Sequence, residues 1–204
     1  KLLLNKPLIG WTIEAALSCS YITETIVTTE SQKIAEIAKT HGANVPFMRP
    51  NELSQDSTPG IEPVLHAIGH LPQYDWVLLL QPTSPLRTVE DICGIIDLVV
   101  SKKASSAVSV TDAVNHPFWT YSLDGLKLKP FFRSDNSYQR QLLPQAYSLN
   151  GALYFASSKF LIENRTFITS ETLGYVMPKS RSIDIDDADD WQLAKYFLRS
   201  KNKF

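Results

Sequence analysis

One short apolar run most constrains how this chain folds. Residues 76–80 carry no charge and are followed at once by a loop in which two prolines bracket small polar residues. Such a run, bounded by turn residues, is typical of a strand buried on both faces, and ligands of open α/β sheets bind beyond the carboxyl ends of such strands. The alternative is a plain strand-to-helix connection capped by Thr88. We expect a ligand site whose polar side chains are Gln81, Thr83, Ser84 and Arg87.

Helical and strand patterns alternate on both sides of this run. Helices are expected over residues 8–20, 31–42, 61–70, 89–100 and 158–162 and near the carboxyl end. Strands are expected over residues 22–29, 45–48, 107–111, 150–156 and 173–177. This alternation predicts parallel strands joined by right-handed crossovers. We therefore predict a single α/β domain over residues 1–204, with a mostly parallel sheet and helices on both faces.

The composition fits one such domain and excludes several functions. With 204 residues, 44% of them hydrophobic, the chain can bury a substantial core. Its 20 basic and 21 acidic residues form no long run of one sign, so the charge footprint of a nucleic-acid-binding protein is missing. No apolar run approaches the roughly 18 residues of a membrane span, and no signal-peptide pattern opens the chain. We expect a soluble, cytoplasmic protein that binds neither nucleic acid nor membrane.

Two pairs of residues resemble metal or redox sites only superficially. Cys19 and Cys93 each lie in a helical apolar pattern, so we expect two reduced core thiols rather than a disulfide or a metal site. His66 and His70 are four residues apart, a spacing found in metal sites, but no carboxylate or cysteine adjoins them as a third ligand. We therefore expect solvated or capping histidines.

Residues 112–143 interrupt the alternation. Aromatic residues are interleaved there with turn formers, and Asp124-Gly125 between two short apolar segments predicts a β-hairpin. Aromatic side chains exposed on such a ribbon favour a dimerisation arm. The alternative is a lid that folds onto its own domain.

Two acidic residues alternate with isoleucines near the carboxyl end. In an extended segment, Asp184 and Asp186 point to one side while Ile183 and Ile185 point to the core. Converging carboxylates repel each other unless a cation neutralises them, and hard oxygen ligands favour Mg²⁺. The alternative, in which the acids only cap the final helix, explains Asp187 and the acids after it better than it explains the inward-facing pair.

Several of these motifs resemble one family. Residues 81–87 (Gln-Pro-Thr-Ser-Pro-Leu-Arg) and residues 182–186 (Ser-Ile-Asp-Ile-Asp) are similar to the two sharpest motifs of the CMP-sialic acid synthetases, or acylneuraminate cytidylyltransferases, which include enzymes for legionaminic and pseudaminic acids. Residues 140–146 and 150–154 resemble further motifs. The resemblance implies a Rossmann-like nucleotidyltransferase fold. It also implies Mg²⁺-dependent transfer of CMP from CTP to the anomeric hydroxyl of a nine-carbon 2-keto sugar acid, with release of pyrophosphate.

The resemblance also implies a role for each motif residue. Asp184 and Asp186 would hold the metal and, with Arg140, form the catalytic set. Gln81, Thr83, Ser84 and Asn150 would bind the sugar side, and Phe167 resembles an aromatic that reaches the neighbouring subunit of a homodimer. Arg49 and Asp56 lie in a turn-rich loop that resembles a nucleotide-side loop; the alternative for them is a loop held by local salt bridges and Asx turns. Ser148 stands where family members often carry a basic residue.

The resemblance also raises the question of an amino-terminal segment, and two alternative functions remain. Family members begin with a strand and a glycine-containing loop that cradles the triphosphate; that segment would end just before Lys1, and we expect the gene to encode it upstream. One alternative is the cytidylyltransferase of the eight-carbon acid 3-deoxy-manno-octulosonate, against which the motif at residues 81–87 argues. The other is a nucleotide-sugar-binding homologue without catalysis.

Overall fold

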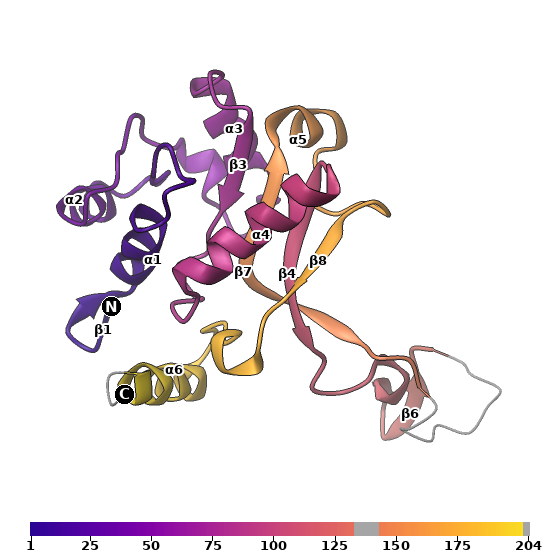
Figure 1. Ribbon diagram of the computed structural model, residues 1–204. Helices are drawn as coiled ribbons and strands as arrows, with labels where there is room; N and C mark the ends of the chain where they lie inside the picture. Colours follow the sequence, from indigo (N-terminus) through magenta and orange to yellow (C-terminus); the bar gives the residue numbers. More distant parts are fainter. Residues whose placement is uncertain (133–142, 202–204) are drawn as a thin grey trace.

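The computed structural model describes residues 1–132 and 143–201, and Figure 1 shows their arrangement. Arg140 therefore lies outside the described residues, as does part of the predicted insertion over residues 112–143. The main sheet has four strands in the spatial order β3-β7-β4-β8. They are β3 (Trp76–Leu79), β7 (Tyr147–Ser157), β4 (Ser106–Asp112) and β8 (Leu173–Val176).

This sheet is mixed, which corrects the prediction of a mostly parallel one. Strands β3, β4 and β8 run in one direction, but β7 runs the opposite way between β3 and β4, so two of the three pairings are antiparallel. The cause lies in the connection. The chain leaves the end of β4, passes through residues 113–146 and returns as β7 with Tyr147 opposite Asp112. The two strands are thus the arms of one long hairpin, which pairs strands antiparallel.

Helices cover both faces of the sheet, as predicted. Leu153 and Phe155 of β7 pack under helix α4 (Val89–Lys102), whereas Ala156 of the same strand packs with helices α3 (Glu62–His70) and α5 (Ser158–Asn164). Side chains one residue apart in a strand point to opposite faces, so these are two separate layers of core. Figure 1 shows α4 crossing in front of the strands.

Further helices lie outside the layers formed by α3, α4 and α5. They are α1 (Leu8–Leu17), α2 (Gln32–Thr40) and α6 (Ala188–Lys201), with short 3-10 turns η1 (Asn51–Leu53), η2 (Pro117–Trp119) and η4 (Lys179–Arg181). Ser31 caps α2 as predicted: its side chain accepts from the N–H of Ile34, and Gly42 follows the helix with a φ of +91°. In the part of the chain that the structure describes, no helix combines the length and apolarity needed to cross a membrane.

Two predicted strands do not form, and one hairpin was not predicted. Residues 22–29 form only a single isolated parallel bridge, between Ile26 and Asn44, and Asn44 lies just before residues 45–48. Their β-branched residues favour extended backbone, but a strand also needs a partner in register. Before α1, β1 (Leu2–Leu3) and β2 (Lys6–Pro7) form a small hairpin whose two turn residues, Leu4 and Asn5, have positive φ.

The predicted ribbon at Asp124-Gly125 is confirmed as a hairpin. Strands β5 (Tyr121–Asp124) and β6 (Lys127–Pro130) pair antiparallel, and Gly125 has a φ of +60°. Figure 1 shows this ribbon standing away from the four-stranded sheet, beyond the ends of β4 and β7. Its apolar side chains are exposed; they include Leu123, Leu126, Leu128 and Phe131.

Candidate active site

The loop after β3 is fixed in place by a buried arginine. Arg87 is only 4% exposed, and its guanidinium donates to the backbone carbonyl of Gln81 and, at 2.8 Å, to the hydroxyl of Thr12 in α1. Burial lowers the pKa of Arg87 to about 9, while the nearby carboxylates of Asp184 and Asp91 oppose that shift. The guanidinium thus remains charged at neutral pH, and it ties the loop to a core helix.

The segment that carries the two predicted metal ligands is extended but joins no strand ladder. Residues 182–186 were expected to be extended; the N–H of Ile185 bonds the carbonyl of Thr83 at 2.9 Å, but no ladder of strand hydrogen bonds continues from that bond. The alternation nevertheless holds for the isoleucines: Ile183 and Ile185 pack against the apolar cluster that contains Leu86. The Gln81 loop and the acidic segment are therefore held against each other by a backbone hydrogen bond and by core packing.

Two further contacts fix the position of the acidic segment. Arg181 makes two hydrogen bonds of 2.8 Å to the carboxylate of Asp91, a residue of α4 that is 1% exposed. This planar, two-point contact is geometrically more specific than a single ion pair. Ser182 accepts a 2.9 Å hydrogen bond from the side chain of Asn150. The segment is therefore anchored just before Asp184.

Gln81 and Asp184 converge over a glycine of β7. Gly151 has a φ of +70°, and a Cβ atom placed on it would lie 2.5 Å from Oδ2 of Asp184 and 2.8 Å from Oε1 of Gln81. Only glycine leaves room for both side chains and adopts this φ without strain. The two motifs therefore meet over β7, and their meeting depends on Gly151.

Asp184 has the signature of a ligand-binding carboxylate. Its Oδ1 atom is buried but has no hydrogen-bond partner among the described residues. A buried carboxylate oxygen is costly unless a donor or a cation completes it. Asp186, by contrast, is exposed. Within residues 1–132 and 143–201 no three His, Cys, Asp or Glu side chains are arranged to hold a metal ion. A magnesium ion is typically bound by only one or two carboxylates together with substrate phosphates. The carboxylates of Asp184 and Asp186 therefore fit such an ion without a third protein ligand.

The acids after Asp186 cap helix α6, as the alternative interpretation stated for them. The Oδ1 atom of Asp187 accepts from the N–H groups of Asp189 and Asp190, at 2.8 and 3.0 Å. Asp190 in turn accepts from the backbone of Asp186 and Asp187. This reciprocal arrangement is a capping box. It does not involve the side chain of Asp184, which leaves that carboxylate for another partner.

Asn150 lies inside the protein rather than on an open surface. It is 4% exposed, and its amide donates to Ser182 and to the sulfur of Met177. Its carbonyl oxygen accepts from the hydroxyl of Ser109 at 2.5 Å and from a backbone N–H. Asn150 therefore connects β4, β7 and the acidic segment. Direct contact with a sugar, which the resemblance implies, stays a prediction.

The other residues predicted for the Gln81 loop have different environments. Ser84 is fully buried and its hydroxyl has no hydrogen-bond partner among the residues described here. Thr83 is half-buried, and its carbonyl is occupied by Ile185. Thr88 caps α4 in a reciprocal arrangement with Asp91. The loop is thus both a capped strand-to-helix connection and a wall of the site.

Arg49 holds its own loop in place, which was one of the two roles predicted for it. Its guanidinium bonds Glu30 at 2.7 Å and the hydroxyl of Ser54 at 2.9 Å. The hydrogen bond from Arg49 holds the pKa of Glu30 below its ordinary value. Asp56, in the same loop, is exposed. Contact of either residue with a nucleotide stays a prediction.

The remaining predictions concern aromatic and histidine side chains. Phe167 is 8% exposed and packs on Tyr154 in this chain's own core, with ring centres 5.5 Å apart. Contact of Phe167 with a neighbouring subunit stays a prediction, and the position of Phe167 in the core does not favour it. His66 and His70 stack on each other and on Phe47, as an aromatic cluster. Burial, together with the neighbouring His70, lowers the pKa of His66.

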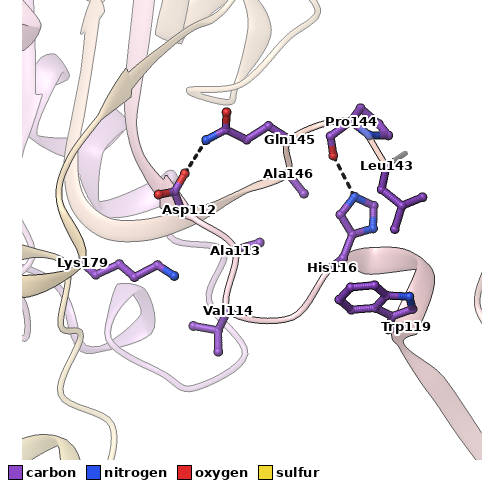
Figure 2. A pocket seen from close by; sticks show the side chains of 10 residues that line it. All are labelled: Asp112, Ala113, Val114, His116, Trp119, Leu143, Pro144, Gln145, Ala146 and Lys179. Atoms are coloured by element: carbon purple, nitrogen blue, oxygen red, sulfur yellow. Dashed lines mark hydrogen bonds between the residues drawn. The ribbon is translucent and has the colours of Figure 1, made fainter. Parts of the chain in front are cut away.

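A pocket of about 250 Å³ opens beyond the ends of β4 and β8 (Figure 2). One wall is polar: the amide of Gln145 donates to Asp112 at 2.7 Å, and a ring nitrogen of His116 lies 3.0 Å from the carbonyl of Pro144. Figure 2 shows Lys179 extending from the other wall toward this opening. No ion pair within the described chain involves Lys179. The pocket therefore presents a cation that is available to an anionic ligand.

Sequence reasoning assigned no role to three residues that build this site: Gly151, Arg181 and Asp91. It placed Arg87 among the side chains that face a ligand, whereas Arg87 is buried and holds the backbone of Gln81. The pairing of Arg181 with Asp91 spans 90 residues of sequence and left no local signal.

Comparisons with known proteins agree with this geometry. The sequence profile of the family described as Cytidylyltransferase matches residues 1–181. CMP-N,N'-diacetyllegionaminic acid synthase of Legionella pneumophila is 38% identical over 205 residues, which cover 97% of this chain and 88% of that protein. N-acylneuraminate cytidylyltransferase of Escherichia coli is 35% identical over 99% of this chain, which spans only 48% of that protein's length.

A solved structure supports the same fold. The structure of CMP:2-keto-3-deoxy-manno-octonic acid synthetase complexed with CTP superposes with a TM-score of 0.73, covering 98% of this chain and 91% of that one. Its sequence identity is 12%, so this likeness establishes the fold alone. The α/β nucleotidyltransferase-like fold predicted from the sequence is thereby confirmed in its general form.

Proposed function

This chain belongs to the cytidylyltransferase family, and from that premise we propose that it transfers CMP from CTP to the anomeric hydroxyl of a nonulosonic acid. The observation that carries the proposal is the convergence of Gln81 and Asp184 over Gly151, with one carboxylate oxygen of Asp184 left unpaired. This polar centre lies where the loop after β3 meets the acidic segment. Relatives named for N,N'-diacetyllegionaminic acid and N-acylneuraminate support the substrate class.

The proposed reaction is an in-line displacement at phosphorus. The sugar hydroxyl oxygen bonds to the α-phosphorus of CTP, the bond from that phosphorus to the bridging oxygen of the β-phosphate breaks, and pyrophosphate leaves while the hydroxyl proton passes to solvent. Such transfers depend mainly on positioning and on stabilisation of charge. A magnesium ion held by Asp184 and Asp186 would neutralise phosphate charge and align the leaving group.

The chain's own residues supply the positioning. Arg87 fixes the backbone of Gln81, so that this amide can direct the sugar acid toward the reacting phosphate. Asn150 fixes Ser182 and hence the start of the acidic segment. The proposal retains the predicted roles of Thr83 and Ser84 on the sugar side, of Arg140 at the sugar or phosphate edge, and of Arg49 and Asp56 on the nucleotide side. It leaves out Phe167, which packs in this chain's own core.

We place the sugar acid between Gln81 and the pocket of Figure 2. Lys179 and Ser182 belong to one turn, in which the N–H of Ser182 bonds the carbonyl of Lys179 at 3.1 Å. Only one residue, Ile183, separates that turn from Asp184. Lys179 is therefore the described cation best placed to attract the carboxylate of the sugar acid.

We also propose that the β5–β6 ribbon forms a homodimer contact. Leu126 is fully exposed, and Leu123 and Leu128 are 70% and 64% exposed on a ribbon that stands away from the sheet. A monomer rarely exposes so many apolar side chains together. Analytical ultracentrifugation tests this: the wild-type protein should sediment as a dimer, and Leu128→Lys should yield monomer. A monomeric wild-type protein at high concentration would remove the ribbon from the proposal.

The central test is pyrophosphate release. The full-length protein, expressed from its complete gene, is assayed with CTP and Mg²⁺ against sialic, legionaminic and pseudaminic acids and the eight-carbon 3-deoxy-manno-octulosonate. Release with one nine-carbon acid, lost on addition of EDTA, supports the proposal and identifies the sugar. Release with the eight-carbon acid alone would transfer the assignment to that rival. No release, with CTP still bound, would indicate a binding protein without catalysis.

A further inference from the structure

Cys19, two residues after the end of α1, lies against Cys93 of α4. They are 74 residues apart in the sequence, yet their sulfur atoms lie 3.2 Å from each other. Both are free thiols. Cys19 is 2% exposed within the main apolar cluster, and Cys93 is half-buried at its edge. The two sulfurs face each other, and one side of the pair is partly open to solvent.

We infer that this pair is a reversible modification site at which an intramolecular disulfide joins the turn after α1 to α4. A disulfide has an S–S length of about 2.05 Å, so the sulfurs have to approach by roughly 1 Å from their present 3.2 Å. The two thiols lie far apart in the sequence, and no other cysteine competes for either of them, because the chain contains only these two. Neither cysteine is among the residues assigned to the proposed transfer reaction.

The oxidant required is a low-molecular-weight disulfide such as oxidised glutathione. The Cys93 thiolate, as the more exposed sulfur, attacks one sulfur of the oxidant, forms a mixed disulfide and releases one thiolate. The Cys19 thiolate then attacks the Cys93 sulfur and releases the second. Two protein thiols are oxidised, one external disulfide is reduced to two thiols, and the protons of the protein thiols are taken up by the leaving thiolates.

The surroundings of Cys93 make this bond slow to form at neutral pH. Burial, followed by its contact with Cys19, raises the pKa of Cys93 to about 11. Because the thiolate is the reacting species, oxidation accelerates as the pH rises toward that value. The ionisable groups that face Cys93 are Cys19, Glu90 and Asp97, Tyr21 after α1, and Tyr175 of β8.

The bond would connect the turn that follows α1 to α4, and these two helices position the Gln81 loop. α1 supplies Thr12, whose hydroxyl accepts from Arg87, and α4 begins two residues after Arg87. A crosslink also closes a long loop and so removes conformations from the unfolded chain. We expect the oxidised protein to unfold at a temperature higher by roughly 5–15 °C than the reduced protein.

The test uses the purified protein in a buffer of oxidised and reduced glutathione at pH 8. Remaining thiols are alkylated, and the intact mass and tryptic peptides are measured. The expected product has lost two hydrogen atoms, carries no glutathione, and yields one peptide pair joined through Cys19 and Cys93; dithiothreitol reverses it. Free thiols throughout, a stable glutathione adduct on Cys93, or dimers linked by disulfides would each overturn the inference.

Two variants distinguish the order of attack. In Cys19→Ser the mixed disulfide on Cys93 should persist, because no resolving thiol is present. In Cys93→Ser the buried Cys19 should acquire no adduct while the protein is folded. Rapid modification of Cys19 in that variant would contradict the proposed entry through Cys93. A crosslinked wild-type protein that melts below the reduced form would overturn the expected clamping of α1 to α4.

Discussion

Two charged segments that look alike in the sequence end in opposite chemical situations. The loop at Arg49 follows a predicted strand, the segment at Asp184 was predicted to be extended, and each was expected to face a ligand. Arg49 is paired with Glu30 and Ser54, so its donors are used by the fold. Asp184 converges with Gln81 over Gly151, yet one of its buried oxygen atoms has no partner among the described residues. A charge near a strand end predicts a ligand only when the protein leaves that charge unsatisfied.

The largest effect is expected from removing the unpaired carboxylate. In Asp184→Asn the shape is kept, but the charge that would hold a divalent ion is lost, and several kcal/mol of transition-state stabilisation go with it. We expect kcat to fall by roughly 10³-fold, because each 1.4 kcal/mol changes the rate about tenfold. Pyrophosphate release at saturating CTP and sugar acid measures this.

Asp187→Ala is the matched control for that variant. Asp187 is acidic and close in sequence, but its carboxylate caps α6. Its loss should lower stability by about 1 kcal/mol and leave kcat within twofold. Equal loss of activity in both variants would indicate that either substitution disturbs the whole acidic segment. The claim that Asp184 acts on a ligand while Asp187 only caps α6 would then be wrong.

The next effect concerns the glycine under the two converging side chains. In Gly151→Ala the new Cβ would meet Asp184 at 2.5 Å and Gln81 at 2.8 Å, so at least one side chain has to move. Misplacement of a reacting group by about 1 Å can cost on the order of 10²-fold in rate. We expect kcat to fall by about that factor, with circular dichroism unchanged.

Gly125→Ala separates crowding from backbone strain. Gly125 has a similar positive φ, of +60°, but a Cβ there meets nothing within 4 Å. Both variants carry the strain of a left-handed alanine, about 1 kcal/mol, and only Gly151→Ala adds the clash. Activity lost equally in both would assign the effect to strain and would weaken the argument that the site is built over Gly151.

Several features of the fold and of the candidate site could be predicted from the sequence. The apolar run before Gln81, the alternation of Ile183 with Asp184, and the Asp124-Gly125 turn are local patterns, and local patterns predict local structure. The direction of β7 was not accessible, because it depends on how residues 113–146 return to the sheet. The ion pair of Arg49 with Glu30 and the closeness of Cys19 to Cys93 depend on tertiary packing, which leaves no periodic signal.

A smaller effect is expected at the pocket of Figure 2. Lys179→Met keeps the length of the side chain and removes the cation that faces the opening. We expect the KM for the sugar acid to rise about tenfold, in line with the loss of one charged contact, while the KM for CTP stays the same. Lys159→Met, on the exposed surface of α5, removes the same charge elsewhere and should change neither. A rise in the KM for CTP would place the nucleotide, rather than the sugar, beside Lys179.

The smallest effect should come from the segment whose charges are already satisfied. In Arg49→Gln the contact with Glu30 is lost, and because both side chains are partly exposed, the free energy of unfolding should fall by only about 0.5 kcal/mol at pH 7. Arg49 lowers the pKa of Glu30 below its ordinary 4.5, so the stabilisation is present above that pH and is lost as the pH falls through the lowered value. Urea unfolding should therefore show a larger difference between wild type and variant at pH 7 than at pH 3. A tenfold loss of kcat/KM for CTP in this variant would show instead that Arg49 contacts the nucleotide as well as stabilising the fold. Arg49 and Asp184 would then both act on a ligand, and they would differ only in the size of their effects.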